Sequence, residues 1–428
     1  MLLYRIIISG YFFMLRMAAF FSPKARLWVQ GRKDIQPYLQ QNMGDDAVIW
    51  FHCASLGEFE QGRPLMEKMK EDFPEIKLLL TFFSPSGYEI RKDYEVADYV
   101  CYLPEDKPKA IREFLTQVHP KMVVFVKYDY WFLLLQALIK EKIPIYFVSA
   151  VVKNGHFLTK WYAAPFRKIL RQVNHFFVQD EFSRKQLEQM GVMQVSVAGD
   201  TRVDRVAKLA QNVRVYPQIE KWAKGHRVLI CGSTWENDEA IIVPSFEKWM
   251  QKGWRIIIAP HDVSRKNVAR LRKNLPNSFL EMTKILTDNQ QVIQYINKDI
   301  ILVDTIGHLN SLYQFGTVCY IGGGFNKSGI HNTLEPATFG LPLVFGPNYM
   351  KFAEAKTFIK KEGAFSIGKW KGKKSMLPSE DCQKQFDEVM EAFQDEKIIK
   401  KAGKITKEYI NNQVGATTEI LKTLYLHL

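Results

Sequence analysis

The chain has 428 residues, 47% of them hydrophobic and 24% charged, which is typical of a globular protein and too long for one ordinary core, so we expect two domains. Its five cysteines are scattered and never in CxxC spacing, which indicates a reducing compartment and argues against a disulfide framework or a zinc site. The net charge of +14 favours an anionic lipid surface or a phosphorylated substrate, and because no nucleic-acid-binding signature accompanies it, a nucleic-acid partner is not expected.

Residues 1–21 are mostly apolar but include Arg5 and Arg16. A membrane span needs about 20 apolar residues with few charges, so this segment is marginal as a full span. A signal peptide would end in a small-residue cleavage site, which is not found after Ala18-Ala19. We therefore expect an uncleaved anchor or an interfacial helix, or alternatively an amphipathic helix packed on the first domain. In the first two cases anionic headgroups would face Lys24, Arg26, Arg32 and Lys33.

Residues 48–51 form an apolar run that predicts a buried parallel strand, followed by a turn with Gly57. Chemistry in α/β sheets is concentrated at the carboxyl ends of the strands. Glu58 lies directly at this turn, where a carboxylate can take a proton from a sugar hydroxyl. We predict Glu58 as the general base of a transferase and Glu60 as a solvated or capping residue.

Ser55 and Gly57 match part of the G-x-S-x-G motif of a hydrolase nucleophile elbow. The elbow needs a glycine where Cys53 stands, so the pattern argues against serine hydrolysis. Cys53 is expected to be a small buried residue. His52, inside the strand, is expected to be a hydrogen-bonded core histidine.

Strands and amphipathic helices alternate along the chain, which predicts doubly wound parallel sheets. Residues 22–205 form the expected first domain, 206–226 a polar linker, 227–406 a second domain, and 407–428 a helix that could pack back on the first. The expected strands after the first are 77–82, 99–103, 122–126, 145–149, 175–179 and 195–198, then 227–231, 254–259, 300–303, 318–321 and 343–345. Two Rossmann-like domains facing a central cleft resemble the GT-B layout of nucleotide-sugar transferases.

The stretch from Ile321 to Pro336 reads IGGGFNKSGIHNTLEP and predicts a nucleotide site. Consecutive glycines let the backbone approach a ligand closely. A helix start following them can hold a phosphate, and Glu335 can accept hydrogen bonds from ribose hydroxyls. Neither GxGxxG nor GxxxxGK[ST] is present, so a dinucleotide fingerprint and a P-loop are not expected. The alternative is a structural turn.

Two further candidate sites directly follow predicted strands of the first domain. Lys127 and Asp129 follow the strand at 122–126, and Arg202 follows the strand at 195–198. A cation here could balance the phosphate of a departing nucleotide without a metal. The alternatives are a surface ion pair of Asp129 with Lys127 and a linker charge for Arg202.

Several motifs together resemble the 3-deoxy-D-manno-octulosonic acid (Kdo) transferases of lipopolysaccharide synthesis. The resemblance is carried by LWVQGRK at 27–33, HCASLGE at 52–58, SPSG at 84–87, YLPED at 102–106, DTIG at 304–307 and GIHNTLEP at 329–336. It implies a metal-independent, inverting GT-B transferase at the cytoplasmic face of the inner membrane. The reaction implied is transfer of Kdo from CMP-Kdo to the lipid A precursor (lipid IVA).

The resemblance places the catalytic base on Glu58 and the transition-state-stabilising positions on Asp129 and Arg202. The implied donor contacts fall on Pro260, His261, Ile306, Gly307, His308, Ser328, Gly329, His331, Asn332, Thr333, Leu334 and Glu335. The chain departs from the family pattern at Lys127, Asp129, His261, His308 and Thr333. A non-hydrolysing nucleotide-sugar epimerase on the same frame and a non-catalytic polyanion binder are the competing interpretations.

Overall fold

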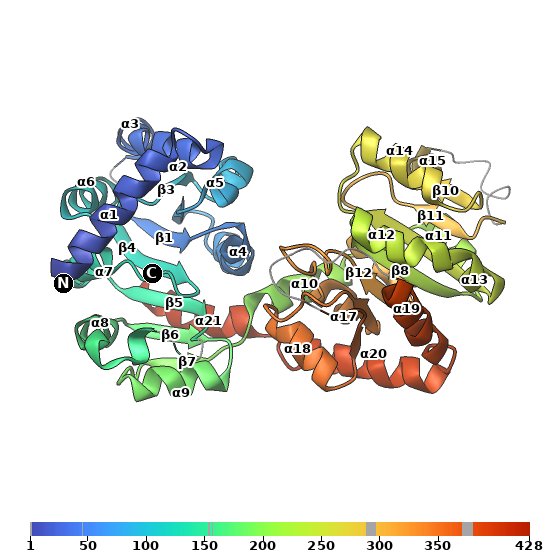
Figure 1. The fold of residues 1–428 in the computed structure, drawn as a ribbon. Helices are drawn as coiled ribbons and strands as arrows, with labels where there is room; N and C mark the ends of the chain where they lie inside the picture. Colours follow the sequence, from blue (N-terminus) through green and yellow to red (C-terminus); the bar gives the residue numbers. More distant parts are fainter. Residues whose placement is uncertain (1, 45, 153–154, 156, 288–296, 370–379) are drawn as a thin grey trace. The chain divides into compact units, whose positions relative to one another are not determined.

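The structure is a computed structural model that describes residues 2–44, 46–152, 155, 157–287, 297–369 and 380–428. It divides into two compact units: residues 1–204 with 413–428, and residues 205–412. Each unit contains one seven-stranded sheet with parallel pairing throughout. The predicted fold class, two doubly wound parallel α/β sheets, is confirmed (Figure 1).

The sheet of the N-terminal unit has the strand order β3-β2-β1-β4-β5-β6-β7. Its strands are β1 (Val48–Cys53), β2 (Lys77–Phe82), β3 (Tyr99–Tyr102), β4 (Pro120–Val126), β5 (Ile145–Ala150), β6 (His175–Val178) and β7 (Val195–Val197). The helices between them are α4 (Leu56–Asp72), α5 (Pro85–Arg91), α6 (Pro108–Val118), α7 (Phe132–Lys140), α8 (Ala164–Leu170) and α9 (Glu181–Gln189). Helix α10 (Thr201–Gln211) begins in this unit and continues into the next. Short 3-10 turns lie at Phe157–Thr159 and Trp161–Ala163.

Strand β1 is buried on both faces, as a central parallel strand requires. Trp50 and its neighbours Leu79 and Val123 belong to one apolar cluster, whereas Ile49 and Phe51 belong to a second. Because successive side chains of a strand point to opposite faces, these two clusters are the cores above and below the sheet.

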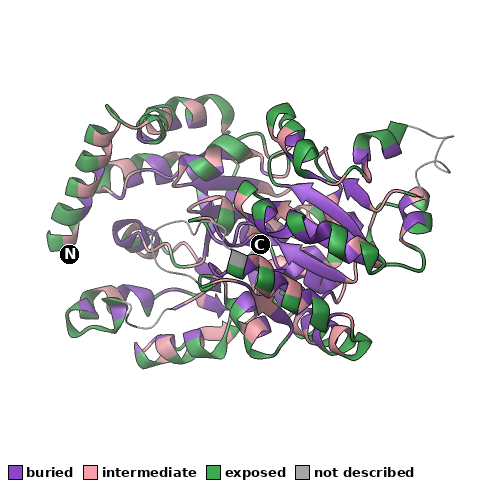
Figure 2. Cartoon of the chain, turned by 45° about the vertical axis from the view of Figure 1, so that its right-hand side comes forward, coloured by how far each residue is buried: buried purple, intermediate pink, exposed green. Residues whose placement is uncertain are grey.

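Three helices precede β1: α1 (Leu2–Ala18), α2 (Pro23–Lys33) and α3 (Ile35–Asn42). One face of α1 packs on the N-terminal unit, with Ile8 and Phe12 buried and the Tyr4 hydroxyl donating to Asp106 at 2.6 Å. Much of α1 is coloured as exposed in Figure 2. The large apolar side chains exposed on its outer face and on the turn after it are Leu2, Leu3, Ile6, Ile7, Phe13, Met14, Met17, Phe20 and Phe21. The first helix is therefore packed on one side and apolar but uncovered on the other.

No single helix among the described residues has both the length and the apolar character to cross a membrane. Helices α1 and α2 together meet these criteria, but the pair is bent by 117°.

Arg32 departs from the expectation that it faces headgroups with Lys24, Arg26 and Lys33. Its guanidinium lies 3.8 Å from the ring centre of Trp28, and donates to the carbonyl oxygens of Trp28 and Phe83. Burial lowers the pKa of Arg32 to about 9. The aromatic rings beside it explain the correction, because a guanidinium stacks well on such faces.

The sheet of the C-terminal unit has the order β10-β11-β9-β8-β12-β13-β14. Its strands are β8 (Arg227–Thr234), β9 (Trp254–Pro260), β10 (Phe279–Glu281), β11 (Ile300–Leu302), β12 (Val318–Ile321), β13 (Leu343–Phe345) and β14 (Ala364–Ser366). Its helices are α11 (Pro217–Ala223), α12 (Glu236–Ile242), α13 (Phe246–Gln251), α14 (Arg265–Asn274), α15 (Met282–Thr287), α16 (Leu309–Leu312), α17 (Leu334–Thr338), α18 (Ala353–Lys360), α19 (Glu380–Ala392) and α20 (Glu396–Asn411). Both edge strands, β10 and β14, are missing from the sequence-based prediction.

The single helix predicted over residues 407–428 is wrong. Helix α20 ends at Asn411, Gly415 adopts a φ of 113°, and α21 (Ala416–Leu424) then begins. A positive φ of this kind suits glycine and interrupts a helix. Helix α21 belongs to the N-terminal unit, where it packs on α4 (Figure 1).

Candidate active site

Glu58 occupies the first turn of α4, directly after the carboxyl end of β1. The Ser55 hydroxyl donates to one carboxylate oxygen of Glu58, and the Lys127 ammonium lies 3.9 Å from the other. Only 15% of the Glu58 side chain is exposed. The structure thus brings the predicted base beside the loop that follows β4, as expected for neighbouring parallel strands.

Asp129 does not pair with Lys127, which was the surface alternative. Its Oδ2 instead contacts His52 Nε2 at 2.8 Å and accepts a hydrogen bond from Trp131 Nε1, also at 2.8 Å. Because an ionised carboxylate only accepts, the Nε2 of His52 carries the proton in this contact. Asp129 is therefore held in a fixed orientation by two ring N–H groups.

A buried chain of hydrogen bonds supports this carboxylate from within the sheet. His52 Nδ1 lies 2.9 Å from Thr81 Oγ1, which itself accepts from Trp50 Nε1 at 2.8 Å. His52 is fully buried with both nitrogens engaged, so the prediction of a hydrogen-bonded core histidine is confirmed. Cys53 is also fully buried, as predicted, and burial raises the pKa of its thiol, which argues against a nucleophile.

Arg202 lies at the start of α10 in an ion pair. Its guanidinium donates to both oxygens of Asp200, and Asp200 also accepts from Gln61 at 3.2 Å. Gln61 lies three residues after Glu58 on α4, so this pair is tied to the helix that carries the predicted base. The Arg202 guanidinium lowers the pKa of Asp200 despite that carboxyl group's burial.

Glu60 differs from the solvated or capping residue expected, because it pairs with Arg91 at 3.2 Å and is largely covered.

In the C-terminal unit, the three glycines after β12 have a structural reason. A Cβ on Gly322 would meet Ser233 O at 2.1 Å, and one on Gly324 would meet Gly346 Cα at 2.5 Å. These glycines admit neighbouring backbone, so the alternative of a structural turn accounts for them.

Asp238 organises this loop, and the sequence-based interpretation overlooked it. Its carboxylate accepts from Gly323 N at 2.8 Å, Trp235 N at 2.9 Å and the Tyr320 hydroxyl at 2.9 Å. Complete burial raises the pKa of Asp238 to about 6, although these hydrogen bonds oppose the shift. Asp238 lies three positions after Trp235, the residue that precedes α12. This spacing was the available signal, since an acidic residue at the third helical position can cap the helix.

Three rings meet at the carboxyl edge of the second sheet. Trp235 follows β8, His261 follows β9, and His331 follows β12. His261 stacks at 4.5 Å from each of the other two ring centres, and Trp235 Nε1 donates to His331 Nε2 at 2.7 Å. Two predicted donor-site residues are thus in contact, joined by a tryptophan that sequence reasoning missed.

The other predicted donor-site residues are in varied environments. Asn332 Nδ2 donates to Glu335 at 3.0 Å and Asn332 Oδ1 accepts from Leu334 N, whereas the side chains of Thr333 and Leu334 are buried. The His308 ring is buried against Tyr216, with Nδ1 2.7 Å from the hydroxyl. Ile306 and Ser328 are exposed. Pro260, at the end of β9, and Gly329 are buried. Gly307 and Gly329 have a positive φ. The helix expected to hold a phosphate, α17, has only five residues.

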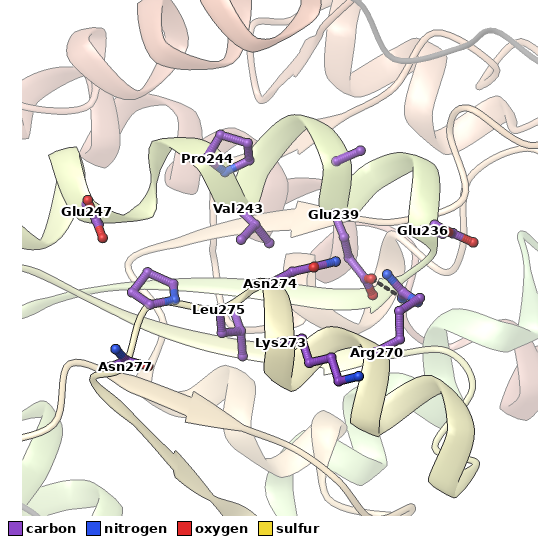
Figure 3. Close-up of a pocket in the computed structure, with 12 residues that line it drawn as sticks. Glu236, Glu239, Val243, Pro244, Glu247, Arg270, Lys273, Asn274, Leu275 and Asn277 are labelled. Carbon is purple, nitrogen blue, oxygen red and sulfur yellow. Dashed lines mark hydrogen bonds and ion pairs between the residues drawn. The ribbon is translucent and has the colours of Figure 1, made fainter.

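A cavity of about 700 Å³ lies between α12–α13 and α14 (Figure 3). Beside it Arg270 pairs with Glu239, which also accepts from the Thr234 hydroxyl at 3.0 Å. No predicted site residue is among the residues that line this cavity.

The two parallel α/β units, each with polar side chains at the carboxyl edge of its sheet, define a GT-B-like fold. A solved structure of UDP-GlcNAc 2-epimerase from Neisseria meningitidis, bound to UDP-GlcNAc, has a TM-score of 0.54 and 16% identity, covering 89% of this chain and all of the other. This likeness concerns the fold alone.

Sequence comparison identifies the relatives. Residues 26–205 match the family model of 3-deoxy-D-manno-octulosonic-acid transferase (kdotransferase). The 3-deoxy-D-manno-octulosonic acid transferase of Haemophilus influenzae is 25% identical over 74% of this chain and 75% of its own length. The enzyme of the same description from Aquifex aeolicus is 26% identical over 74% of this chain and 81% of its own length. The chain is a relative of the Kdo transferases, as the motifs predicted.

Proposed function

We propose that this protein is a glycosyltransferase that moves Kdo from CMP-Kdo to a sugar hydroxyl of the lipid A precursor. The observation that carries the proposal is the position of Glu58 within the segment that matches the Kdo-transferase model. Its carboxylate stands at the end of a central strand, between the Ser55 hydroxyl and the Lys127 ammonium. Relatives named as Kdo transferases support the substrates.

In the proposed reaction Glu58 takes the proton of the acceptor hydroxyl as that oxygen attacks the anomeric carbon of Kdo. The bond from the anomeric carbon to the CMP phosphate breaks, and the phosphate leaves with the bonding electrons. A single displacement inverts the configuration at this carbon. Asp129, held by His52 and Trp131, and Arg202 would stabilise the charges that develop.

The proposed donor site is in the C-terminal unit and uses no metal. Contacts to CMP-Kdo are proposed for Pro260, His261, Ile306, Gly307, His308, Ser328, Gly329, His331, Asn332, Thr333, Leu334 and Glu335. For the buried members of this set, the contact would come from backbone atoms rather than from side chains.

We also propose that the protein works at the cytoplasmic side of the inner membrane. The exposed apolar face of α1 supports this, because such a face can enter the boundary between headgroups and acyl chains. The exposed cations Lys24, Arg26 and Lys33 on α2 would meet anionic lipid.

Epimerisation of a sugar nucleotide is the second candidate, favoured only by the fold shared with UDP-GlcNAc 2-epimerase. One experiment separates the two functions: incubation of the purified full chain with CMP-Kdo and the lipid A precursor, followed by mass analysis of the lipid. Transfer predicts a product heavier by one or more Kdo residues, with CMP released only when acceptor is present. No Kdo-containing lipid would refute the proposal, and an isomerised sugar nucleotide formed without acceptor would support the epimerase.

A further inference from the structure

Trp235 and His331 form one flat pair of rings in the C-terminal unit. Their planes differ by only 8°, their centres are 6.2 Å apart, and the indole N–H of Trp235 donates to His331 Nε2 at 2.7 Å. His261 lies over both rings, with interplanar angles of 21° and 24°. The hydrogen bond therefore runs edge to edge within a plane that the third ring covers.

This geometry fixes the tautomer of His331. An indole nitrogen can only donate, so Nε2 of His331 must offer a lone pair, and in the neutral ring the proton then resides on Nδ1. Burial lowers the pKa of His331 to about 4, which keeps the ring neutral near pH 7. Protonation of Nε2 would set two N–H groups against each other.

The Nδ1–H that results is an open donor. Among the residues that the structure describes, this nitrogen makes no hydrogen bond, and the His331 side chain is only half-buried. The ring also packs on the glycine loop: a Cβ on Gly323 would meet His331 Cδ2 at 3.0 Å. A donor in a fixed position with one unused N–H is suited to bind an oxyanion.

We propose that Trp235 is a positioning residue that holds His331 as a neutral Nδ1–H donor to an oxyanion of the donor substrate. The oxyanion is the phosphate of the nucleotide or the carboxylate of the sugar acid; this identity of the donor rests on the proposed function. The titratable groups facing His331 and its platform are His261 above the rings, Asp262 beside His261, and Asp238, which accepts from the backbone N–H groups of Trp235 and Gly323.

The first test is the nitrogen NMR spectrum of the imidazole rings in the full chain without ligand, with His331 assigned by loss of its signals in His331→Gln. The expected result is a neutral ring protonated on Nδ1 from pH 5.5 to 8. A ring protonated on Nε2, or one that gains its second proton within this range, overturns the proposal.

The second test uses Trp235→Phe, which keeps an aromatic ring but removes the N–H. Binding of CMP and of free Kdo is measured separately by calorimetry without acceptor, together with the shift of the His331 nitrogens. Trp222→Phe is the matched control, since Trp222 is buried in the same unit and donates to the Lys298 carbonyl oxygen. We expect binding of one of the two ligands to weaken about 3- to 10-fold in Trp235→Phe and to stay unchanged in Trp222→Phe.

The affected ligand identifies the oxyanion: CMP indicates the phosphate and Kdo the carboxylate. Equal binding by both variants, or no shift of the His331 nitrogens with either ligand, refutes the role of Trp235. If the NMR and binding results are as expected but no Kdo is transferred to the lipid, the proposed reaction with the acceptor is refuted and the role of Trp235 is not.

Discussion

The two units share one sheet architecture but carry different kinds of side chain at the carboxyl edges of their sheets. In the N-terminal unit the side chains are charged: Glu58 stands beside Lys127, and Asp129 contacts His52. In the C-terminal unit the corresponding edge carries the stacked rings of Trp235, His261 and His331. Burial lowers the pKa of both histidines, so neutral rings dominate there.

This difference separates proton transfer from binding. A base must change its charge during the reaction, and the N-terminal unit offers carboxylates for that purpose. A recognition site gains from donors and acceptors whose protonation stays constant, and the C-terminal unit offers rings held neutral by their surroundings. The buried support differs accordingly, since His52 and Thr81 hold Asp129 in one unit and Asp238 holds the glycine loop in the other.

The largest effect is expected from Glu58→Gln, which removes the proposed base but keeps the shape. We expect kcat to fall by about 10² or more, while CMP binding is retained because the donor site is in the other unit. Glu60→Gln, two residues along the same helix, is the matched control and should keep kcat within about threefold. Turnover of both variants is measured with saturating donor and acceptor. Near-normal turnover of Glu58→Gln would show that Glu58 is not the general base.

We expect His331, the neutral histidine of the C-terminal unit, to make the free energy of unfolding depend on pH. The folded pKa of His331, about 4, is below the value of about 6.5 expected for the unfolded chain. The unfolded chain therefore binds a proton first, and the free energy of unfolding falls as the pH decreases from about 6.5 to about 4. The loss attributable to this group is at most about 3 kcal/mol.

Chemical unfolding of the full chain at pH 7 and pH 5 measures this loss, with His331→Gln as the comparison. The amide oxygen of glutamine can still accept from Trp235, but the group does not titrate. Asp238, whose pKa is raised to about 6, shifts stability in the opposite direction, but it is present in both proteins. Equal losses in the two proteins would contradict the prediction.

The fold was predictable because local pattern and tertiary environment agree. Continuous apolar runs such as residues 122–126 became central strands, and Pro108 begins α6 where its missing N–H costs little. The three-residue strands β10 and β14 were missed because pairing at a sheet edge, rather than their own sequence, forms them. The break at Gly415 was missed because a glycine within a helical pattern does not reveal its φ.

The candidate site was predictable at the level of strand ends but not of side-chain partners. Parallel topology brings Glu58 and Asp129 to one edge, so both could be found from the sequence. The group that Asp129 contacts depends on the register between β1 and β4 and on side-chain rotamers. The sequence pattern therefore could not predict that Asp129 contacts His52 rather than Lys127. Trp235 was overlooked because its partner, His331, is 96 residues away.

A smaller catalytic effect is expected from Asp129→Asn, which keeps an acceptor for His52 and Trp131 but removes the charge. Hydrogen bonds to a charged group are worth more than neutral ones, so we expect kcat to fall about tenfold. Asp180→Asn is the control, because Asp180 caps α9 and asparagine caps equally well. If kcat is unchanged in both variants, the buried hydrogen-bond chain has no part in the reaction.

The smallest effect concerns how the C-terminal helix completes the N-terminal unit. Asp204 accepts from Gly415 N and Thr417 N, both at 2.6 Å, at the start of α21. Asp204→Ala leaves these N–H groups without that acceptor and should lower the free energy of unfolding by about 1 kcal/mol, whereas Asp204→Asn should restore most of it. Glu419→Ala, an exposed change on α21, should shift it by less than about 0.5 kcal/mol. Equal losses for Asp204→Ala and Glu419→Ala in urea unfolding would mean that apolar packing of α21 on α4, rather than this cap, holds the returning helix.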